Sequence, residues 1–161
     1  MEIKAGLGFD LHRLKKGRKL FLGGIEIEYS KGLLGHSDGD CLIHAIIDAL
    51  LGAMGEGDIG QAFPETEPRY KDTRSTELLK QIVNKVKEAS FEILNIDTVI
   101  MAQEPRLSPH VEKMKDVLCP ILEIKREALG IKAKTMEGSG LIGRKKAMAS
   151  LATTLLRKRE G

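Results

Sequence analysis

The chain has 161 residues, of which 42% are hydrophobic and 30% are charged, and its formal net charge is +3. This balance excludes an intrinsically disordered chain and a membrane protein, and it predicts one globular domain over residues 1–161. The small net charge and the aromatic content of 4% also exclude a typical nucleic-acid-binding surface. The first residues lack the basic segment and apolar run of a secretion signal, which indicates a cytoplasmic protein.

The N-terminal part of the chain has the pattern of β-structure. Residues 3–12 are a short segment that contains two glycines, and they predict a strand that ends near His12. Residues 19–22 and 25–29 flank a Gly-Gly pair, and the second segment alternates apolar residues with Glu. Because two glycines supply the positive φ of a tight turn, these segments predict a β-hairpin.

Two helices are predicted in the middle of the chain. Residues 40–54 are dense in apolar side chains and stop at a glycine, which predicts a helix and its end. After a polar loop, residues 73–89 place apolar side chains on one helical face and lysines outside it. Cys41 and Cys119 both lie in apolar helical patterns, which predicts buried free thiols and argues against a disulfide framework.

Strands and helices alternate in the predicted C-terminal half. Residues 93–103 have the β-branched content of a strand, and residues 131–135 alternate as another. A helix is expected from Ser108, with this serine as its cap and proline in the first turn. Residues 145–159 have apolar side chains at helical spacing and predict a final helix. Together the elements predict an α+β fold, an α/β sandwich with one mostly β-sheet layer covered by helices.

Ligand-type side chains stand out in the first strand and the first helix. Asp40, His44 and Asp48 are spaced four apart in the helix and share one stripe, while Asp10 and His12 share one face of the strand. Asp10, His12 and His44 together would suit zinc with one position open, and Asp48 could accept the second ring N–H of His44. The alternative is a surface stripe that exposes a His–Asp pair unrelated to the strand.

Residues 36–40, with the sequence His-Ser-Asp-Gly-Asp, directly precede this helix. Backbone amides and the Ser37 hydroxyl at the positive end of a helix dipole would favour an anionic phosphate. The alternative is a helix cap at Asp38 or Asp40, and we expect one of them to cap the helix in either case.

A second candidate for phosphate binding follows the strand at residues 131–135. Thr135 and Glu137 lead into a glycine-rich loop that ends near Arg144. Backbone amides and Thr135 can donate to a diphosphate, Arg144 can pair with its oxygens, and Glu137 can hold a divalent cation. Because glycine-rich loops are common, an ordinary structural loop is the alternative.

Several short motifs follow one another along nearly the whole chain. They are Gly8-Phe9-Asp10-Leu11-His12, His36-Ser37-Asp38-Gly39-Asp40, His44, Gly57-Asp58-Ile59-Gly60, Phe63-Pro64 and Gly143-Arg144. In order and spacing they resemble the family of 2-C-methyl-D-erythritol 2,4-cyclodiphosphate synthases. Each motif alone is modest, but their conjunction is specific.

The resemblance implies a metal-dependent phosphorus–oxygen lyase in the non-mevalonate route to isoprenoid precursors. Its substrate is 4-diphosphocytidyl-2-C-methyl-D-erythritol 2-phosphate, and its products are the 2,4-cyclodiphosphate and CMP. The nucleophile is a phosphate oxygen of the substrate itself, so no activated serine or cysteine is needed. The enzyme has to hold the two ends of the substrate together and neutralise their charge.

The resemblance also assigns metal ligands and catalytic residues. Asp10, His12 and His44 match the zinc ligands, and Glu137 matches the ligand of a second cation, magnesium or manganese. Thr135 matches a residue that touches the phosphates of the nucleotide. These five residues form the expected catalytic set.

Contacts to the methylerythritol phosphate match a second set of positions. His36 and Ser37 match a loop over its phosphate, and Asp58 and Gly60 match positions around its carbon chain. Glu65, also expected near the substrate, stands where the family has aspartate.

The cytidine end and the oligomer match further positions. A pocket for cytosine, built largely from backbone groups, matches Ala102, Pro105, Arg106 and Leu107. Members of the family are homotrimers with active sites between neighbouring subunits. Arg144 matches a residue near the axis of this trimer.

Other functions fit parts of the pattern. A zinc phosphohydrolase would use the same metal set with water as nucleophile, and Asp38 or Asp58 could serve as its general base. A non-catalytic nucleotide-binding or scaffold protein would need no stoichiometric zinc, so metal content separates it from an enzyme. A nucleic-acid-binding module is disfavoured because the basic residues are scattered over helix faces.

Overall fold

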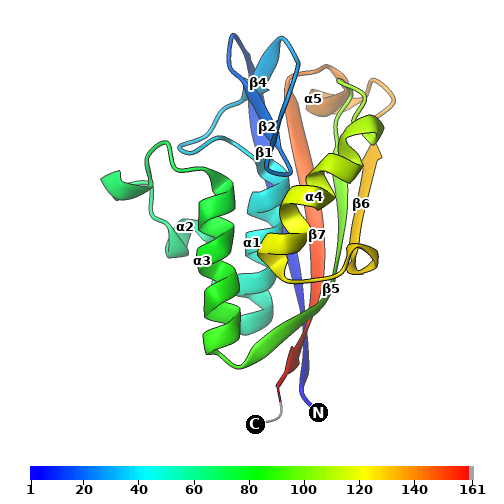
Figure 1. Ribbon diagram of the computed structural model, residues 1–161. Helices are drawn as coiled ribbons and strands as arrows, with labels where there is room; N and C mark the ends of the chain where they lie inside the picture. Colours follow the sequence, from blue (N-terminus) through cyan, green and yellow to red (C-terminus); the bar gives the residue numbers. More distant parts are fainter. Residues whose placement is uncertain (160–161) are drawn as a thin grey trace.

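The computed structural model describes residues 1–159. It contains a five-stranded sheet in the order β4-β1-β7-β5-β6 (Figure 1). Neighbouring strands are antiparallel, except that β5 and β6 are parallel. The remaining two strands, β2 and β3, form a separate hairpin. The strands are β1 Ile3–Lys16, β2 Leu20–Leu22, β3 Ile25–Ile27, β4 Lys31–Leu33, β5 Phe91–Met101, β6 Leu129–Lys134 and β7 Ala147–Lys158.

Three longer helices lie against one face of the sheet, which confirms the predicted α+β fold (Figure 1). Their apolar sides and the inner face of the sheet form one continuous core, in which both cysteines are buried free thiols. Within residues 1–159, no helix has the length and apolar character that crossing a membrane requires. The helices are α1 Cys41–Met54, α2 Ile59–Ala62, α3 Ser75–Glu88, α4 Val111–Leu122 and α5 Gly140–Gly143, with 3-10 turns at Pro68–Tyr70, Ser108–His110 and Arg126–Ala128.

Helix α1 packs directly on the backbone of β1. A Cβ atom at Gly6 would lie 1.9 Å from the carbonyl oxygen of Ala49, and one at Gly8 would lie 1.9 Å from that of Ala45. Any side chain at these two positions would collide with the helix backbone, so glycine is required for the close approach. The contact places the first turns of α1 over the middle of β1.

The N-terminal strand is longer than predicted, whereas the hairpin is as predicted. Strand β1 continues to Lys16, where its last three residues pair with β4. Strand β4 was not predicted, because three residues are too few to show an alternating pattern. Gly23 and Gly24 have φ values of 62° and 80°, as the tight turn requires.

The predicted final helix over residues 145–159 is wrong, because most of this segment is the central strand β7. From Leu151 onward its side chains alternate in burial: Ala152, Thr154 and Leu156 face the helices, while Leu151 and Leu155 lie on the opposite, exposed face. Leucines four residues apart share a face in a strand as well as in a helix, so spacing alone did not separate the two.

The other helices and strands begin and end close to the predicted positions. The Asp40 side chain caps α1 by accepting from the Ile43 amide, and Gly55 ends the helix with φ of 77°. The prediction that Ser108 caps a helix is wrong. Its hydroxyl accepts from Arg106 Nε and makes no capping bond, and a 3-10 turn precedes α4.

Replacing Gly8 with Ala tests the close approach of α1 to β1. We expect the free energy of unfolding to fall by about 3 kcal/mol or more, because the new methyl group meets helix backbone that cannot move without lifting α1. Gly17→Ala is the control: it also adds a methyl group, at a residue with φ of 74° but open space around it. It should cost only about 1–2 kcal/mol. Equal losses in chemical denaturation would contradict the packing argument.

Candidate metal centre and substrate pocket

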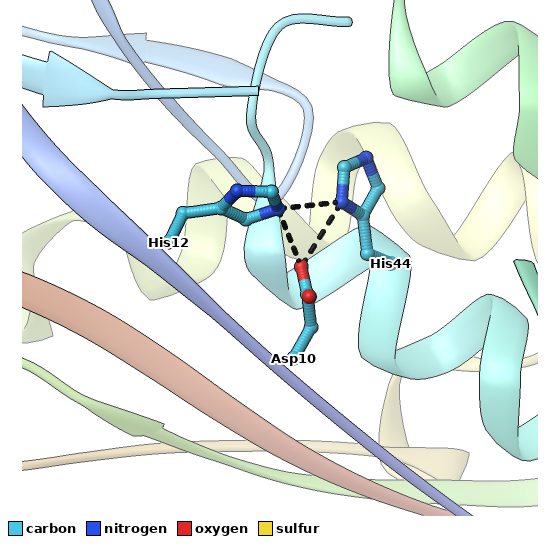
Figure 2. A group of neighbouring side chains, drawn as sticks. All are labelled: Asp10, His12 and His44. Carbon is cyan, nitrogen blue, oxygen red and sulfur yellow. Dashed lines mark hydrogen bonds and ion pairs between the residues drawn. The ribbon is translucent and has the colours of Figure 1, made fainter. Parts of the chain in front are cut away.

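Three ligand-type side chains converge where α1 crosses β1 (Figure 2). Asp10 and His12 are two residues apart on β1 and point to the same side, and His44 reaches them from the first turn of α1. Asp10 Oδ2 lies 2.8 Å from His12 Nε2 and 3.0 Å from His44 Nδ1. The two ring nitrogens are 3.1 Å apart. The predicted meeting of the strand pair with the helix histidine is therefore confirmed.

The geometry of this triad fits a metal ion. Three donor atoms on a tetrahedral zinc at bond lengths of about 2.0–2.1 Å stand roughly 3.3 Å from one another. The observed separations of 2.8–3.1 Å are close to this value, so small side-chain rotations would open the triad around an ion. Two histidines and one carboxylate also leave a fourth position open, as a catalytic site requires.

The charges within the triad are strongly coupled. Burial by itself would raise the pKa of Asp10, but hydrogen bonds and charge interactions with His12 and His44 outweigh it and lower this pKa to about 2. For His12, burial would lower the pKa, yet the hydrogen bond and charge of Asp10 raise it above 6.5. The carboxylate is thus ready to bind a cation, whereas His12, when it is protonated, has to lose its proton before it can bind one.

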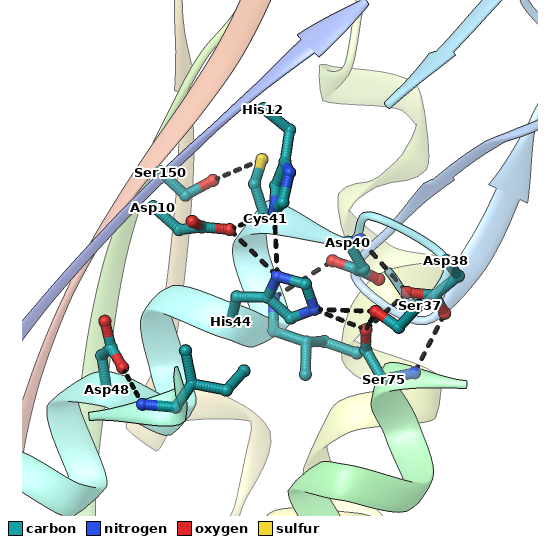
Figure 3. A network of polar contacts seen from close by, with 12 residues as sticks. Asp10, His12, Ser37, Asp38, Asp40, Cys41, His44, Asp48, Ser75 and Ser150 are labelled. Atoms are coloured by element: carbon teal, nitrogen blue, oxygen red, sulfur yellow. Dashed lines mark hydrogen bonds and ion pairs between the residues drawn. The ribbon is translucent and has the colours of Figure 1, made fainter. Parts of the chain in front are cut away.

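The second ring nitrogen of His44 faces serine hydroxyls (Figure 3). His44 Nε2 lies 2.9 Å from Ser75 Oγ, and Ser37 Oγ is 3.2 Å away. The prediction that Asp48 accepts this N–H is wrong, because Asp48 accepts from the Ile59 amide at the start of α2. One helical turn separates His44 from Asp48, but the imidazole extends away from it, toward α3 (Figure 3).

Asp38 and Asp40 hold the elements around the site together. Asp38 accepts from the amide and hydroxyl of Ser75, from the Asp40 amide and from Arg74 Nε. The Asp40 carboxylate accepts from the amides of the β2–β3 turn and from the first turn of α1. Of the two roles considered for this segment, the helix cap is confirmed, and the start of α1 is already occupied by a carboxylate.

A cavity of about 180 Å³ opens beside the metal triad. Of the predicted substrate contacts it brings together His36, Ser37, Gly60 and Glu65. Asp58 does not line it, because its side chain caps α2 by accepting from the Gln61 amide. The lining residues are Asp10, His12, His36, Ser37, His44, Ile59, Gly60, Phe63, Glu65, Tyr70 and Leu78.

One histidine in the cavity wall has an unmet hydrogen-bonding requirement. The Nε2 atom of His36 is buried and, among the described residues, has no hydrogen-bond partner. A buried polar atom without a partner costs free energy, and a ligand in the cavity can supply one.

The remaining predicted contacts form a second group, outside this cavity. Thr135 Oγ1 donates to Glu137 Oε1 over 3.1 Å beyond the end of β6. The Ala102 amide donates to the Lys134 carbonyl, which joins the end of β5 to the same region. The group consists of Ala102, Pro105, Arg106, Leu107, Thr135, Glu137 and Arg144, and none of its members lines the cavity at the triad. Within residues 1–159, the cavity at the triad therefore contains only part of the predicted site.

Sequence reasoning missed Ser75, the hydroxyl next to His44. Ser75 is fully buried and begins α3, more than thirty residues away from the histidine along the chain. A serine at a helix start ordinarily indicates a cap, so no local pattern could have linked it to the site.

A family model and curated relatives match nearly the whole chain. Residues 3–157 match the model of the YgbB family. The 2-C-methyl-D-erythritol 2,4-cyclodiphosphate synthase of Caldicellulosiruptor bescii is 48% identical over 153 residues, which are 95% of this chain and 98% of that protein. The synthase of Treponema denticola is 50% identical over 154 residues, which are 96% of each chain.

Solved structures agree in fold. The CDP complex of IspF from Plasmodium falciparum has a TM-score of 0.86 at 33% identity, covering 98% of this chain and 97% of that one. The bifunctional IspDF from Campylobacter jejuni has a TM-score of 0.94 at 43% identity. That match covers 99% of this chain and 43% of the bifunctional chain.

The raised pKa of His12 predicts how metal binding depends on pH. As pH falls through this pKa, His12 gains a proton that a metal must displace, whereas Asp10 stays ionised down to about 2. We expect the affinity for zinc, measured by competition with a chelator, to fall about tenfold or more from about pH 8 to about pH 6. His36→Ala should show the same dependence because His36 is not a ligand. A pH-independent affinity would show that His12 does not bind the metal.

Proposed function

The chain belongs to the YgbB family, that of the 2-C-methyl-D-erythritol 2,4-cyclodiphosphate synthases, and we propose that the triad of Asp10, His12 and His44 is its catalytic metal centre. The protein converts 4-diphosphocytidyl-2-C-methyl-D-erythritol 2-phosphate into 2-C-methyl-D-erythritol 2,4-cyclodiphosphate and CMP. The observation that carries the proposed site is the convergence of three metal-type donors at the edge of a cavity.

The reaction is an internal transfer. An oxygen of the 2-phosphate forms a bond to the phosphorus of the diphosphate that is attached to methylerythritol. The bond from that phosphorus to the bridging oxygen breaks, and CMP leaves with the electron pair of this bond. No water enters and no group of the protein is consumed. The chain has to fold the substrate so that nucleophile and phosphorus meet in line, which supplies effective concentration, and to neutralise the crowded negative charge.

Zinc is the ion that the triad suits best, because two imidazoles and one carboxylate in a site with an open position are typical ligands of catalytic zinc. Asp10, His12 and His44 would hold it, and it would supply positive charge to phosphate oxygens in the cavity. His36 supports the assignment of the cavity to the substrate. Its unpartnered Nε2 can contact the methylerythritol phosphate, next to the hydroxyl of Ser37.

The second group of predicted contacts completes the site from a neighbouring copy. Glu137 would hold magnesium or manganese at the diphosphate, and Thr135 would touch the phosphates of the nucleotide. Backbone groups at Ala102 and at residues 105–107 would receive cytosine. None of these residues lines the cavity at the triad, which supports assigning them to the site of a neighbouring copy, so that two copies surround one substrate.

The uncovered face of the sheet supports a homotrimer. Leu7 is 67% exposed and Phe9 is 53% exposed, and Leu11, Leu151 and Leu155 lie on the same face. A contiguous apolar patch of this kind on a soluble protein usually marks an interface between subunits. We assign this face to the trimer contact, with Arg144 near its axis.

A hydrolase with water as nucleophile is less well supported. Asp38, one candidate for its general base, is buried and already accepts four hydrogen bonds. Asp58, the other candidate, caps α2 and does not line the cavity. Neither carboxylate is placed to activate water beside the triad.

Mass spectrometry of the products tests the function directly. After incubation of the protein with the cytidine-linked substrate, zinc and magnesium, we expect CMP and the cyclic diphosphate in equal amounts. CMP together with a product heavier by one water would indicate the hydrolase. Metal-loaded protein that releases no CMP would indicate a binding protein.

Two substitutions separate the proposed metal sites. His44→Ala should abolish turnover and reduce bound zinc to well below one ion per chain, because two ligands hold zinc far less tightly than three. Glu137→Gln should reduce turnover by about a hundredfold or more while zinc content stays at the wild-type level. Zinc content is measured by elemental analysis of dialysed protein. Retained activity in zinc-free His44→Ala protein would exclude the triad as the catalytic centre.

A charge placed on the exposed sheet face tests the trimer. Leu7→Asp should convert the trimer into monomers, because three buried carboxylates would meet an apolar interface. Light scattering coupled to size exclusion measures the mass. Asn84→Asp, on the exposed side of α3, introduces the same charge and should leave the trimer intact. A Leu7→Asp protein that remains trimeric would place the interface elsewhere.

A further inference from the structure

Each ring nitrogen of His44 is linked to a different carboxylate, one directly and the other through a serine hydroxyl. Nδ1 lies 3.0 Å from Asp10 Oδ2, while Nε2 lies 2.9 Å from Ser75 Oγ, which in turn donates to Asp38 (Figure 3). One carboxylate thus contacts the imidazole directly and the other acts through a hydroxyl. Their effects on the imidazole are opposed.

Metal ligation requires one particular tautomer of this histidine. A neutral imidazole carries one N–H, and only the nitrogen without it can bind a metal. Because Nδ1 is the atom that faces His12 and Asp10, the proton has to be on Nε2. Before metal binds, however, Asp10 favours the opposite tautomer, since its carboxylate can accept a proton held on Nδ1.

The hydrogen bonds around Asp38 fix the direction of the chain at the other end. Its carboxylate accepts from the Ser75 amide at 3.0 Å, the Asp40 amide at 3.1 Å and Arg74 Nε at 3.1 Å, all of which can only donate. The Ser75 hydroxyl therefore donates its proton to Asp38 as well. With its proton committed, the Ser75 oxygen can only accept from His44, so Nε2 must carry the hydrogen.

We infer that Asp38 and Ser75 are positioning residues that set the tautomer of His44 and so prepare Nδ1 to bind the metal. The inference rests on the proposed metal centre and adds to it two residues that touch neither the metal nor the substrate. A carboxylate behind a ligating histidine commonly orients the ring and raises metal affinity. In this chain a serine hydroxyl stands between them.

Ser75 and Ser37 make different contributions, although both hydroxyls are near Nε2. Ser75 is fully buried, is closer to the ring, and is held by Asp38 through both its amide and its hydroxyl. Ser37 Oγ is 3.2 Å from the ring and 3.4 Å from Ser75 Oγ, and within residues 1–159 no carboxylate accepts from it. Ser37→Ala is therefore a matched control, because it removes a hydroxyl beside the same nitrogen.

The test combines nitrogen NMR of metal-free protein with zinc titration. At alkaline pH, the ¹⁵N shifts of His44 report which nitrogen carries the proton. Wild-type protein and Ser37→Ala should show the proton on Nε2. In Ser75→Ala, Asp10 is the remaining carboxylate partner, so the proton should move to Nδ1 and the zinc affinity should fall about 10- to 100-fold. Asp38→Asn keeps the Ser75 hydroxyl but weakens its orientation, and it should give an intermediate loss.

A folded Ser75→Ala protein that keeps the Nε2 proton would overturn the inference, whether or not its zinc affinity falls. Equal effects in Ser75→Ala and Ser37→Ala would also overturn it. If Ser75→Ala does not fold, Asp38→Asn decides by the same two measurements. The NMR result needs neither metal nor substrate. A wild-type protein that binds no zinc would therefore count against the proposed function. The NMR measurement would still decide whether Ser75 sets the tautomer of His44.

Discussion

The contact between the backbones of β1 and α1 is the constraint on which the site depends. Gly6 and Gly8 let the helix lie directly on the strand, with 1.9 Å between the place of a Cβ atom and a helix carbonyl oxygen. Asp10 and His12 follow Gly8 by two and four residues. They lie within 3.0–3.1 Å of His44 only because the helix approaches the strand so closely. Glycines that bring no chemistry of their own thus bring the three ligands together.

The sequence predicted the parts of the site that depend on local periodicity. Residues two apart on a strand and a histidine in an apolar helix made the triad one of two alternatives, and the family resemblance then favoured it over a surface stripe. The hairpin and helices α1 and α3 followed from their patterns. Partners that meet through tertiary packing could not be found in this way. Asp48 has the right spacing for His44 but contacts Ile59, whereas Ser75 has no relation to His44 in sequence.

Strand β7 was mistaken for a helix because its outer face carries apolar side chains, which we assign to a subunit contact. A strand with one solvated face alternates apolar and polar residues, but Leu151 and Leu155 make the outer face of β7 apolar as well. The proposed trimer accounts for these leucines, since it buries the outer face. In the same proposal the group around Glu137 would meet the triad of a neighbouring chain, so one assembly would explain both the apolar sheet face and the division of the predicted site.

The sharing of each active site between two chains is the central claim, and subunit mixing tests it most directly. Inactive His44→Ala and Glu137→Ala proteins are unfolded together in equal amounts, refolded, and assayed for CMP release. If one chain supplies the triad and its neighbour supplies Glu137, about a quarter of the sites in random trimers combine two intact halves, and about a quarter of wild-type activity returns. Mixed trimers that remain inactive would contradict the account, because each chain would then need both residues for its own site.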